Sequence, residues 1–517
     1  GVRVDGVGST PLTTPSTAIF REIQSLELRA QGEEAGGIHD GDGAIASWLG
    51  DTFSVGVVGR VAGEGTQVGP ENDQVEIAPV NDPILTRWEH TTDVGSLPAT
   101  RSYQANKLGT DVISARVGSV ESTRSILVAP PAGPIIRPAG ETRGIVDHSL
   151  TRIPGPGGDR FLVTWFQPDE SLLYWRMFNA DGTPAGPQHS TPVASNGFER
   201  VARVSASDTE ICLVFRRFYD NRNALLFTPL SLTDGSPLRV YPEGHQYAGQ
   251  RIDSLIPGVG LISDHLNVVA SDGFSHLIGF TRFDGIRYNH VVSWIKFDGA
   301  NPPDGRTVAY PADITIPYSF RDDVMDITTV PNHYIIARHV ATSGGSGPTG
   351  LQIDQVDSVT LEAAHVSATL HERNRVVAVA SNGPVTLAAS MEPTASGMAL
   401  KIYRYLYDMQ LEDLTATIPD LQISNPDPLN WPIEMAWDGT QFLTTYARMV
   451  GSISGGTVRN HPQAMVQAVG ANGSLIGPAY SLARESQAPA FVPTAEGGMA
   501  LWLDANRSLV MRQVKYR

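Results

Sequence analysis

FLVTWFQPDESLLYWRMFNADGTPAGPQ, from Phe161 to Gln188, is the stretch that decides the fold. Two apolar runs rich in aromatic and β-branched residues are joined by a short polar turn, and the second run leads into a glycine-rich turn. Such runs indicate β-strands, and Asp-Gly and Asn-Gly pairs suit tight turns because both residues tolerate positive φ. The stretch therefore predicts an antiparallel β-hairpin followed by a further turn.

The same pattern recurs along the rest of the chain. Its second strand begins at Phe161, Ile211, His276, Tyr334, Val385, Phe442 and Met499. Internal repetition in which every element is a strand is typical of a β-propeller, a ring of four-stranded blades. We therefore predict an all-β protein whose larger part is a seven-bladed β-propeller. An eight-bladed ring is the rival count, because Gln246–His265 is long and ambiguous.

The last repeat stops at Arg517, just after its third strand. An open ring would leave unpaired strand edges at both ends of the propeller. We expect the segment before the first repeat, near Ile135–Arg137 or Gly144–Val146, to supply the missing strand.

The sequence divides into four parts. Residues 1–22 are rich in Gly, Thr and Pro and predict a flexible arm. Residues 23–128 contain short alternating strands, as in Ser25–Arg29 and Val112–Val117, and predict a β-sandwich. Residues 129–140 are Pro-rich and predict a stiff linker. Residues 141–517 hold the repeats.

The end of the second part is YQANKLGTDVISARVGSVESTRSILV, in which an aromatic–x–Ala strand, a Leu-Gly-Thr turn, an Ile-x-Ala strand and an apolar strand follow one another. It resembles the closing hairpin of bacterial Ig-like domains of the invasin and intimin type. The matching residues are Tyr103, Ala105, Leu108, Gly109, Thr110, Ile113, Ala115, Ile126 and Val128. The resemblance implies an Ig-like spacer in an exported bacterial surface protein.

The composition narrows the function. The formal net charge of −16 opposes nonspecific binding to nucleic acid or to an anionic membrane. No stretch reaches the ~18 consecutive apolar residues of a membrane-spanning helix. The single cysteine, Cys212, lies in an apolar strand and is expected to fill the core. The chain begins with Gly, which we interpret as removal of a leader, so we expect an extracellular or outer-surface location.

Arginines recur where the second strand of a repeat meets the third. Together with neighbouring tyrosines they form the candidate binding site: Arg217, Tyr219, Arg222, Arg282, Arg287, Tyr288, Arg338 and Arg448. The guanidinium group suits carboxylates and phosphates, and aromatic rings can stack on sugars. The alternative is that each arginine pairs with a neighbour such as Asp220, Asp284 or Asp322, and that the aromatic side chains pack between blades.

Signals for catalysis, metals and cofactors are absent or weak. The sequence has no GxSxG elbow, no P-loop and no HExxH pair. His39–Gly43 contains a fragment of a calcium loop, although a plain turn explains it as well. We expect no cofactor, no metal and no catalytic residue, and we lean against an enzyme.

These observations predict a non-catalytic extracellular or cell-surface binding protein that presents a propeller face to a glycan or protein partner. Two alternatives remain open. The chain could be a structural subunit of a bacterial filament or envelope assembly, docked onto neighbouring subunits through its N-terminal arm. It could also be a carbohydrate-active enzyme, for which loop carboxylates such as Glu170, Glu392 and Asp504 would have to converge.

Overall fold

The chain folds into two compact units, Gly1–Pro131 with Val450–His461 and Ala132–Met449 with Pro462–Arg517. The structure, a computed structural model, describes residues 23–31, 39–40, 44–49, 52–61, 74–77, 85–90, 95–96, 102–107, 109–117, 119–129, 132–155, 158–193, 201–219, 222–238, 250–251, 262–283, 290–298, 314–316, 325–341, 349–367, 377–394, 397–406, 410–418, 421, 432–454, 457–483, 486–495 and 497–515. Among these residues no helix is long and apolar enough to cross a bilayer.

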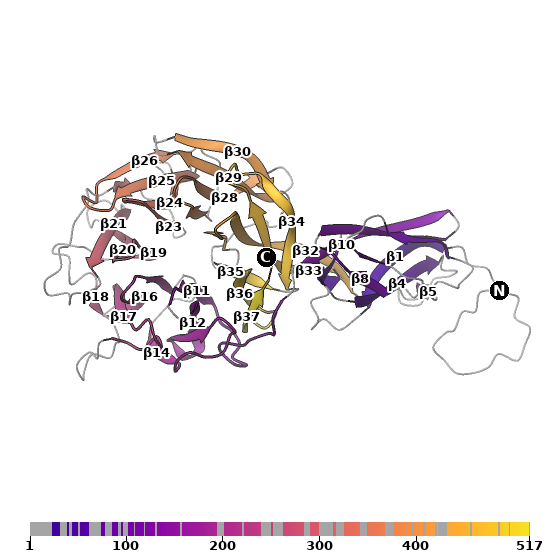
Figure 1. The fold of residues 1–517 in the computed structure, drawn as a ribbon, viewed down its shortest axis with the longest axis horizontal. Coiled ribbons are helices and arrows are strands. Elements are labelled where there is room, and N and C mark those ends of the chain that lie inside the picture. The colour runs from indigo at the N-terminus through magenta and orange to yellow at the C-terminus, as the bar shows by residue number, and fades with distance from the viewer. Residues whose placement is uncertain are drawn as a thin grey trace, which may run out of the picture. The chain divides into compact units, whose positions relative to one another are not determined.

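The first unit contains two β-sheets (Figure 1). One sheet has the order β1 (Ile23–Gln31), β4 (Thr52–Val61), β8 (Ser102–Ala105) and β7 (Gly95–Ser96), with β5 (Gln74–Ile77) also paired to β4. The other has the order β2 (His39–Asp40), β3 (Ala44–Trp48), β10 (Val120–Ala129), β9 (Gly109–Val117) and β6 (Leu85–His90). The β3–β10 pair is parallel, whereas β9 and β10 form an antiparallel hairpin.

Both sheets contribute to one apolar core. Its buried members are Leu28, Ile45, Val55, Val57, Tyr103, Ala105, Ile113, Ala115, Ile126 and Val128. The spacing of two between Ile113 and Ala115, and between Ile126 and Val128, follows from strand alternation. The Tyr103 hydroxyl donates a hydrogen bond of 2.9 Å to buried Asp111. Burial, that bond and the carboxylate charge all raise the pKa of Tyr103, which keeps this donor protonated.

The second unit is a β-propeller with six four-stranded blades (Figure 1), not the seven or eight that the repeats predicted. The blades are β11 (Asp147–Ile153), β12 (Arg160–Gln167), β13 (Leu172–Asn179), β14 (His189–Pro192); β15 (Ala202–Ala206), β16 (Ile211–Tyr219), β17 (Arg222–Leu230), β18 (Gln250–Arg251); β19 (Ile262–Ser271), β20 (Ser275–Phe283), β21 (His290–Asp298), β22 (Ile314–Ile316); β23 (Met325–Val330), β24 (His333–Ala341), β25 (Thr349–Asp357), β26 (Ala363–Ser367); β27 (Val377–Ser381), β28 (Thr386–Thr394), β29 (Gly397–Leu406), β30 (Gln410–Ile418); and β31 (Glu434–Trp437), β32 (Phe442–Ser454), β33 (Thr457–Val469), β34 (Leu475–Ala483). We number them blades 1 to 6.

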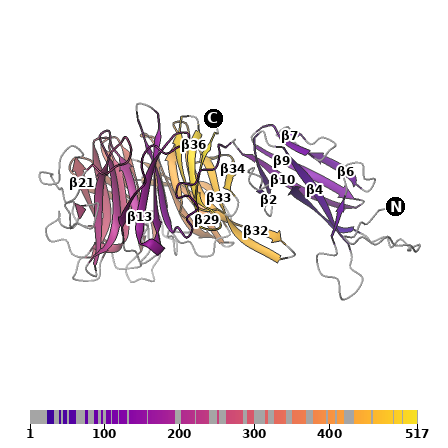
Figure 2. The same cartoon turned by 90° about the horizontal axis from the view of Figure 1, so that it is seen from below.

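The seventh repeat forms a three-stranded sheet, which we call the last sheet: β35 (Gln487–Thr494), β36 (Gly497–Leu503) and β37 (Leu509–Val514). The first strands of successive sheets contact one another from β11 to β35, and β35 in turn contacts β11. The described sheets therefore close into a ring, which Figure 2 shows turned by 90°.

Residues 132–146 run along the last sheet, and we call them the closing segment. Isolated bridges join Ala132 to Val514 and Ile136 to Met511. Ile136 and Met511 exchange two backbone hydrogen bonds of 2.8 Å. Ile136 lies within the stretch Ile135–Arg137, from which the sequence predicted the closing strand, although most of the closing segment had the composition of a linker. The backbone N–H of Ile145 donates to the Arg507 carbonyl at 3.1 Å.

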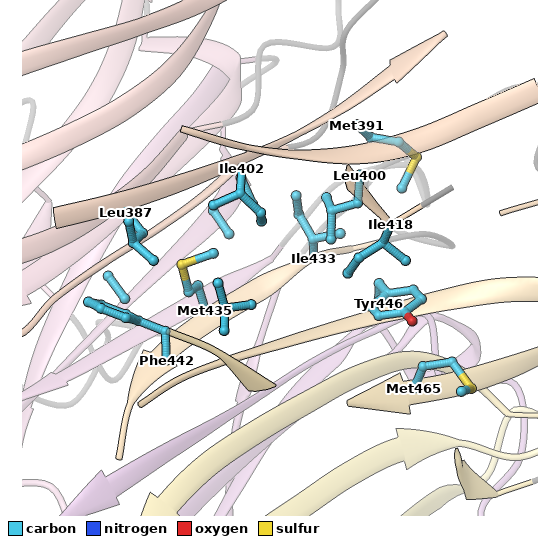
Figure 3. Packing of buried hydrophobic residues seen from close by; sticks show 14 of the residues in the cluster. Leu387, Met391, Leu400, Ile402, Ile418, Ile433, Met435, Phe442, Tyr446 and Met465 are labelled. Carbon is cyan, nitrogen blue, oxygen red and sulfur yellow. The ribbon is translucent and has the colours of Figure 1, made fainter. Parts of the chain in front are cut away.

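Apolar side chains fill the spaces between neighbouring blades. Figure 3 shows the largest cluster, in which Leu387, Met391 and Leu400 of blade 5 face Phe442 and Tyr446 of blade 6. Residues of opposite phase on the blade 5 strands instead pack on blade 4. Strand alternation thus determines, for every strand residue, which neighbouring blade it faces. Cys212 is buried, as the sequence predicted.

Candidate functional site

The two ends of the blades define two faces of the propeller. We call the end where second strands lead into third strands the outgoing face, and the end where first strands turn into second strands the opposite face. From the sequence, the predicted arginines are expected at the outgoing face. Because the strands of every blade are antiparallel, the turns between third and fourth strands lie on the opposite face.

Blade 1 brings an aromatic pair and an acid to the outgoing face. Trp165 on β12 and Tyr174 on β13 are cross-strand partners, with ring centroids 5.5 Å apart and planes inclined by 13°. Both pack toward the last sheet. The Tyr174 hydroxyl donates a hydrogen bond to exposed Glu170, which lies in the 3-10 turn Pro168–Glu170. Burial and Glu170 raise the pKa of Tyr174 to about 12.

Blade 4 contains a buried ion pair between its second and third strands, β24 and β25. Arg338 lies on the face of β24 that carries Tyr334 and Ile336, which pack on blade 3. Its Nε donates to Asp354 Oδ2 at 2.5 Å, and Gln352 Nε2 donates to Asp354 Oδ1 at 2.7 Å. The side chain of Arg338 is 2% exposed and that of Asp354 is 0%. Arg338 Nη1 is buried without a hydrogen-bond partner.

Blade 5 repeats the tyrosine–glutamate pairing with an added base. The Tyr403 hydroxyl donates a hydrogen bond to Glu392, whose other oxygen lies 3.8 Å from Lys401 Nζ. The Lys401 ammonium lies 5.3 Å from the centroid of the Tyr403 ring, within cation–π range. Ser390, the cross-strand partner of Lys401, has a buried hydroxyl without a hydrogen-bond partner. This cluster faces blade 4.

Blade 6 contributes Arg448, which faces blade 5 on the same side of β32 as Phe442 and Tyr446. Its Nε and Nη2 donate to Gln463 Oε1 at 3.4 and 3.2 Å. Arg448 is half-buried, whereas Gln463 is buried. Blades 1, 4, 5 and 6 thus each turn a polar cluster of the outgoing face toward the preceding sheet of the ring.

The structure separates the predicted arginines. Arg338 is an interior ion-pair partner, as the alternative interpretation held, although its acid is Asp354 rather than a loop aspartate. Arg448 reaches no carboxylate among the described residues. The backbones of Arg217, Tyr219, Arg222 and Arg282 lie on β16, β17 and β20, but their side chains fall outside the described ones, as do Arg287 and Tyr288 altogether.

Sequence reasoning missed the tyrosine–glutamate pairs. Glu170 and Tyr174 are four residues apart across a tight turn, and Glu392 and Tyr403 lie on the two strands of one hairpin. A search for Glu and Tyr near the same turn in different repeats would have found both pairs. It also missed Phe274, 75% exposed in the β19–β20 turn on the opposite face.

No group of three or more His, Cys, Asp or Glu side chains that could hold a metal ion occurs in the part of the chain that the structure describes. Of the loop acids considered for catalysis, Glu170 accepts from Tyr174 and Glu392 from Tyr403. Asp504 forms an ion pair of 3.2 Å with Arg137, a residue of the closing segment.

No family model and no curated protein matches this sequence. Solved structures of similar fold include the β-propeller domain of Myceliophteria thermophila Cps50 (Swd1), with 10% identity and a TM-score of 0.40 over 75% of this chain and 100% of that chain. The Dos1 propeller has 12% identity and a TM-score of 0.38 over 83% and 95%. Trypanosoma rangeli sialidase with sialic acid has 10% identity and a TM-score of 0.39 over 71% and 58%.

Proposed function

We propose that this chain is an extracellular or cell-surface binding protein whose propeller presents its outgoing face to a glycan. The observation that carries the proposal is half-buried Tyr174, backed by the buried ring of Trp165 and lying beside exposed Glu170. An aromatic ring at a rim offers its face to the apolar side of a sugar, while a neighbouring carboxylate accepts hydrogen bonds from hydroxyl groups.

The remaining clusters of this face bear on the choice between binding and hydrolysis. Asp354 is balanced by Arg338, and Glu392 by Lys401 and the Tyr403 hydroxyl. A glycoside hydrolase requires two carboxyl groups that reach the scissile bond together. Glu170, Asp354 and Glu392 are instead each held by a donor of their own blade, which favours recognition over hydrolysis.

The proposal extends to the architecture. The closing segment would complete the last sheet and so close the ring, because Ala132 and Ile136 pair with β37. The two-sheet unit would be an Ig-like spacer of the bacterial invasin and intimin type, since the residues that carry the resemblance line its core. In this proposal the protein is exported from a bacterial cell.

Binding can be tested with two aromatic substitutions on opposite faces. Full-length wild type, Tyr174→Ala and Phe274→Ala are compared on a glycan array, and affinities for any retained glycan are measured by calorimetry. We expect Tyr174→Ala to weaken binding at least tenfold and Phe274→Ala to leave it within twofold. Both variants should keep the wild-type melting temperature within a few degrees. A loss confined to Phe274→Ala would instead place the partner on the opposite face, and the proposal would fail.

A further inference from the structure

Arg448 is a half-buried arginine on β32 that reaches no carboxylate among the described residues. The sequence contains 54 acidic and 38 basic residues, so acids are in excess. Four other described arginines, Arg137, Arg152, Arg338 and Arg404, each pair with a carboxylate. Within the part of the chain that the structure describes, the hydrogen bonds of half-buried Arg448 go to the neutral amide of Gln463.

None of the described carboxylates compensates the charge of Arg448 at the outgoing face. Partial burial removes water from the guanidinium group, and one amide oxygen satisfies only part of its five N–H donors. A planar carboxylate fits the donor fork and supplies the missing charge. Tyr446, two residues earlier on the same side of β32, does not compete as an anion, because burial raises its pKa to about 12.

We propose that Arg448, positioned by Gln463, binds the carboxylate of an acidic glycan. This inference rests on the proposed function and names its ligand class. One arginine fork takes one carboxylate, so a glycan with at most one carboxylate on each ring suits it, whereas a polyanion of higher charge density would be repelled by a chain of net charge −16. The Trp165–Tyr174 stack on the same face favours sugar rings over an acidic peptide.

The test uses the full chain and defined probes. Oligogalacturonate and its methyl ester differ only in the carboxylate charge, and a poly-glutamate peptide represents an acidic protein segment. Affinities are measured by calorimetry at two salt concentrations for wild type, Arg448→Gln, Arg448→Lys and Arg152→Gln. Arg152 is the matched control, since it pairs with Asp159 beside a turn of the opposite face.

We expect wild type to bind oligogalacturonate at least tenfold more tightly than the ester, and less tightly at higher salt. Arg448→Gln should abolish this preference, Arg448→Lys should retain part of it because it keeps the charge but loses the fork, and Arg152→Gln should match wild type within twofold. Melting temperatures of the three variants verify that they fold.

Three results would overturn the inference. In the first, wild type binds the methyl ester as tightly as oligogalacturonate. In the second, Arg448→Gln has the same affinities as Arg152→Gln. In the third, poly-glutamate binds more tightly than the glycan, and this binding depends on Arg448. If Tyr174→Ala still weakened binding to a neutral glycan, the proposed function would stand while the Arg448 site failed. If neither Tyr174 nor Arg448 affected binding to any glycan, both would fail.

Discussion

The two ends of each blade are built in different ways. On the opposite face the turn between first and second strands uses one device repeatedly: Asp272, Asn382 and Asp438 each accept a backbone N–H three residues later, at 2.8 Å. On the outgoing face blades 1, 4, 5 and 6 carry polar clusters that differ in composition. The Asp and Asn side chains of the opposite face recur because each turn there has the same backbone N–H group to satisfy. The polar side chains of the outgoing face differ between blades of the same fold, and such a surface is where function can differ.

The largest expected effect concerns the buried ion pair. Arg338→Glu would set a second carboxylate against Asp354 in the interior, which we expect to cost about 3–5 kcal/mol of unfolding free energy or more. Arg448→Glu makes the same change of charge at a half-buried position where no described carboxylate is paired with Arg448. The loss of unfolding free energy should therefore be far smaller than for Arg338→Glu. Denaturant unfolding measures both. Equal stability of the two variants would contradict the different environments assigned to these arginines.

The closing segment gives the next largest effect. Gly182 has φ +81°, and a Cβ there would collide with Ile136 Cδ1 of the closing segment. Gly383 has φ +94°, but a Cβ there meets no atom within 4 Å. Both alanine variants are strained, and we expect Gly182→Ala to be destabilised by about 1–3 kcal/mol more than Gly383→Ala. Similar unfolding midpoints would show that Ile136 does not pack against blade 1.

The repeated turns of the opposite face should matter for stability alone. Asp438→Ala removes the acceptor for the backbone N–H groups of Thr440 and Gln441. We expect a loss of about 1–2 kcal/mol in unfolding free energy. Glycan affinity, measured below the melting temperature, should stay unchanged. A variant that lost affinity without losing stability would give this turn the binding role assigned to the outgoing face.

The smallest expected effect is pH dependence at His189, which stacks on Trp175 with ring centroids 5.5 Å apart. Burial lowers the pKa of His189, and the charge of Asp234 opposes this only in part. The folded state therefore binds the proton more weakly than the unfolded chain, so stability should fall as the pH drops below about 6.5. Melting temperatures at pH 7.5 and 5.5 should differ less for His189→Gln than for wild type. An equal difference would remove His189 from this effect.

The sequence predicted the hairpins and the approximate place of closure, because strand and turn chemistry is local. It gave the Pro-rich stretch two roles, a stiff linker over residues 129–140 and a closing strand near Ile135–Arg137 or Gly144–Val146, and the structure pairs Ile136 with β37. A proline has no N–H group to donate to a neighbouring strand, but an edge strand tolerates it. A Pro-rich stretch can therefore be either a linker or an edge strand that closes a sheet. The partner of Arg338 was missed, because Asp354 lies on the adjacent strand and only the register brings the two together.

Hydrogen exchange of the full chain, with and without a saturating glycan, tests the central claim most directly. The account predicts slower exchange at the ends of the second strands, including the backbone N–H of Ser171 beside Glu170, and unchanged exchange at Phe274 and Ser275 in the β19–β20 turn. Protection confined to that turn, with no change around Ser171, would contradict the assignment of the outgoing face as the binding surface.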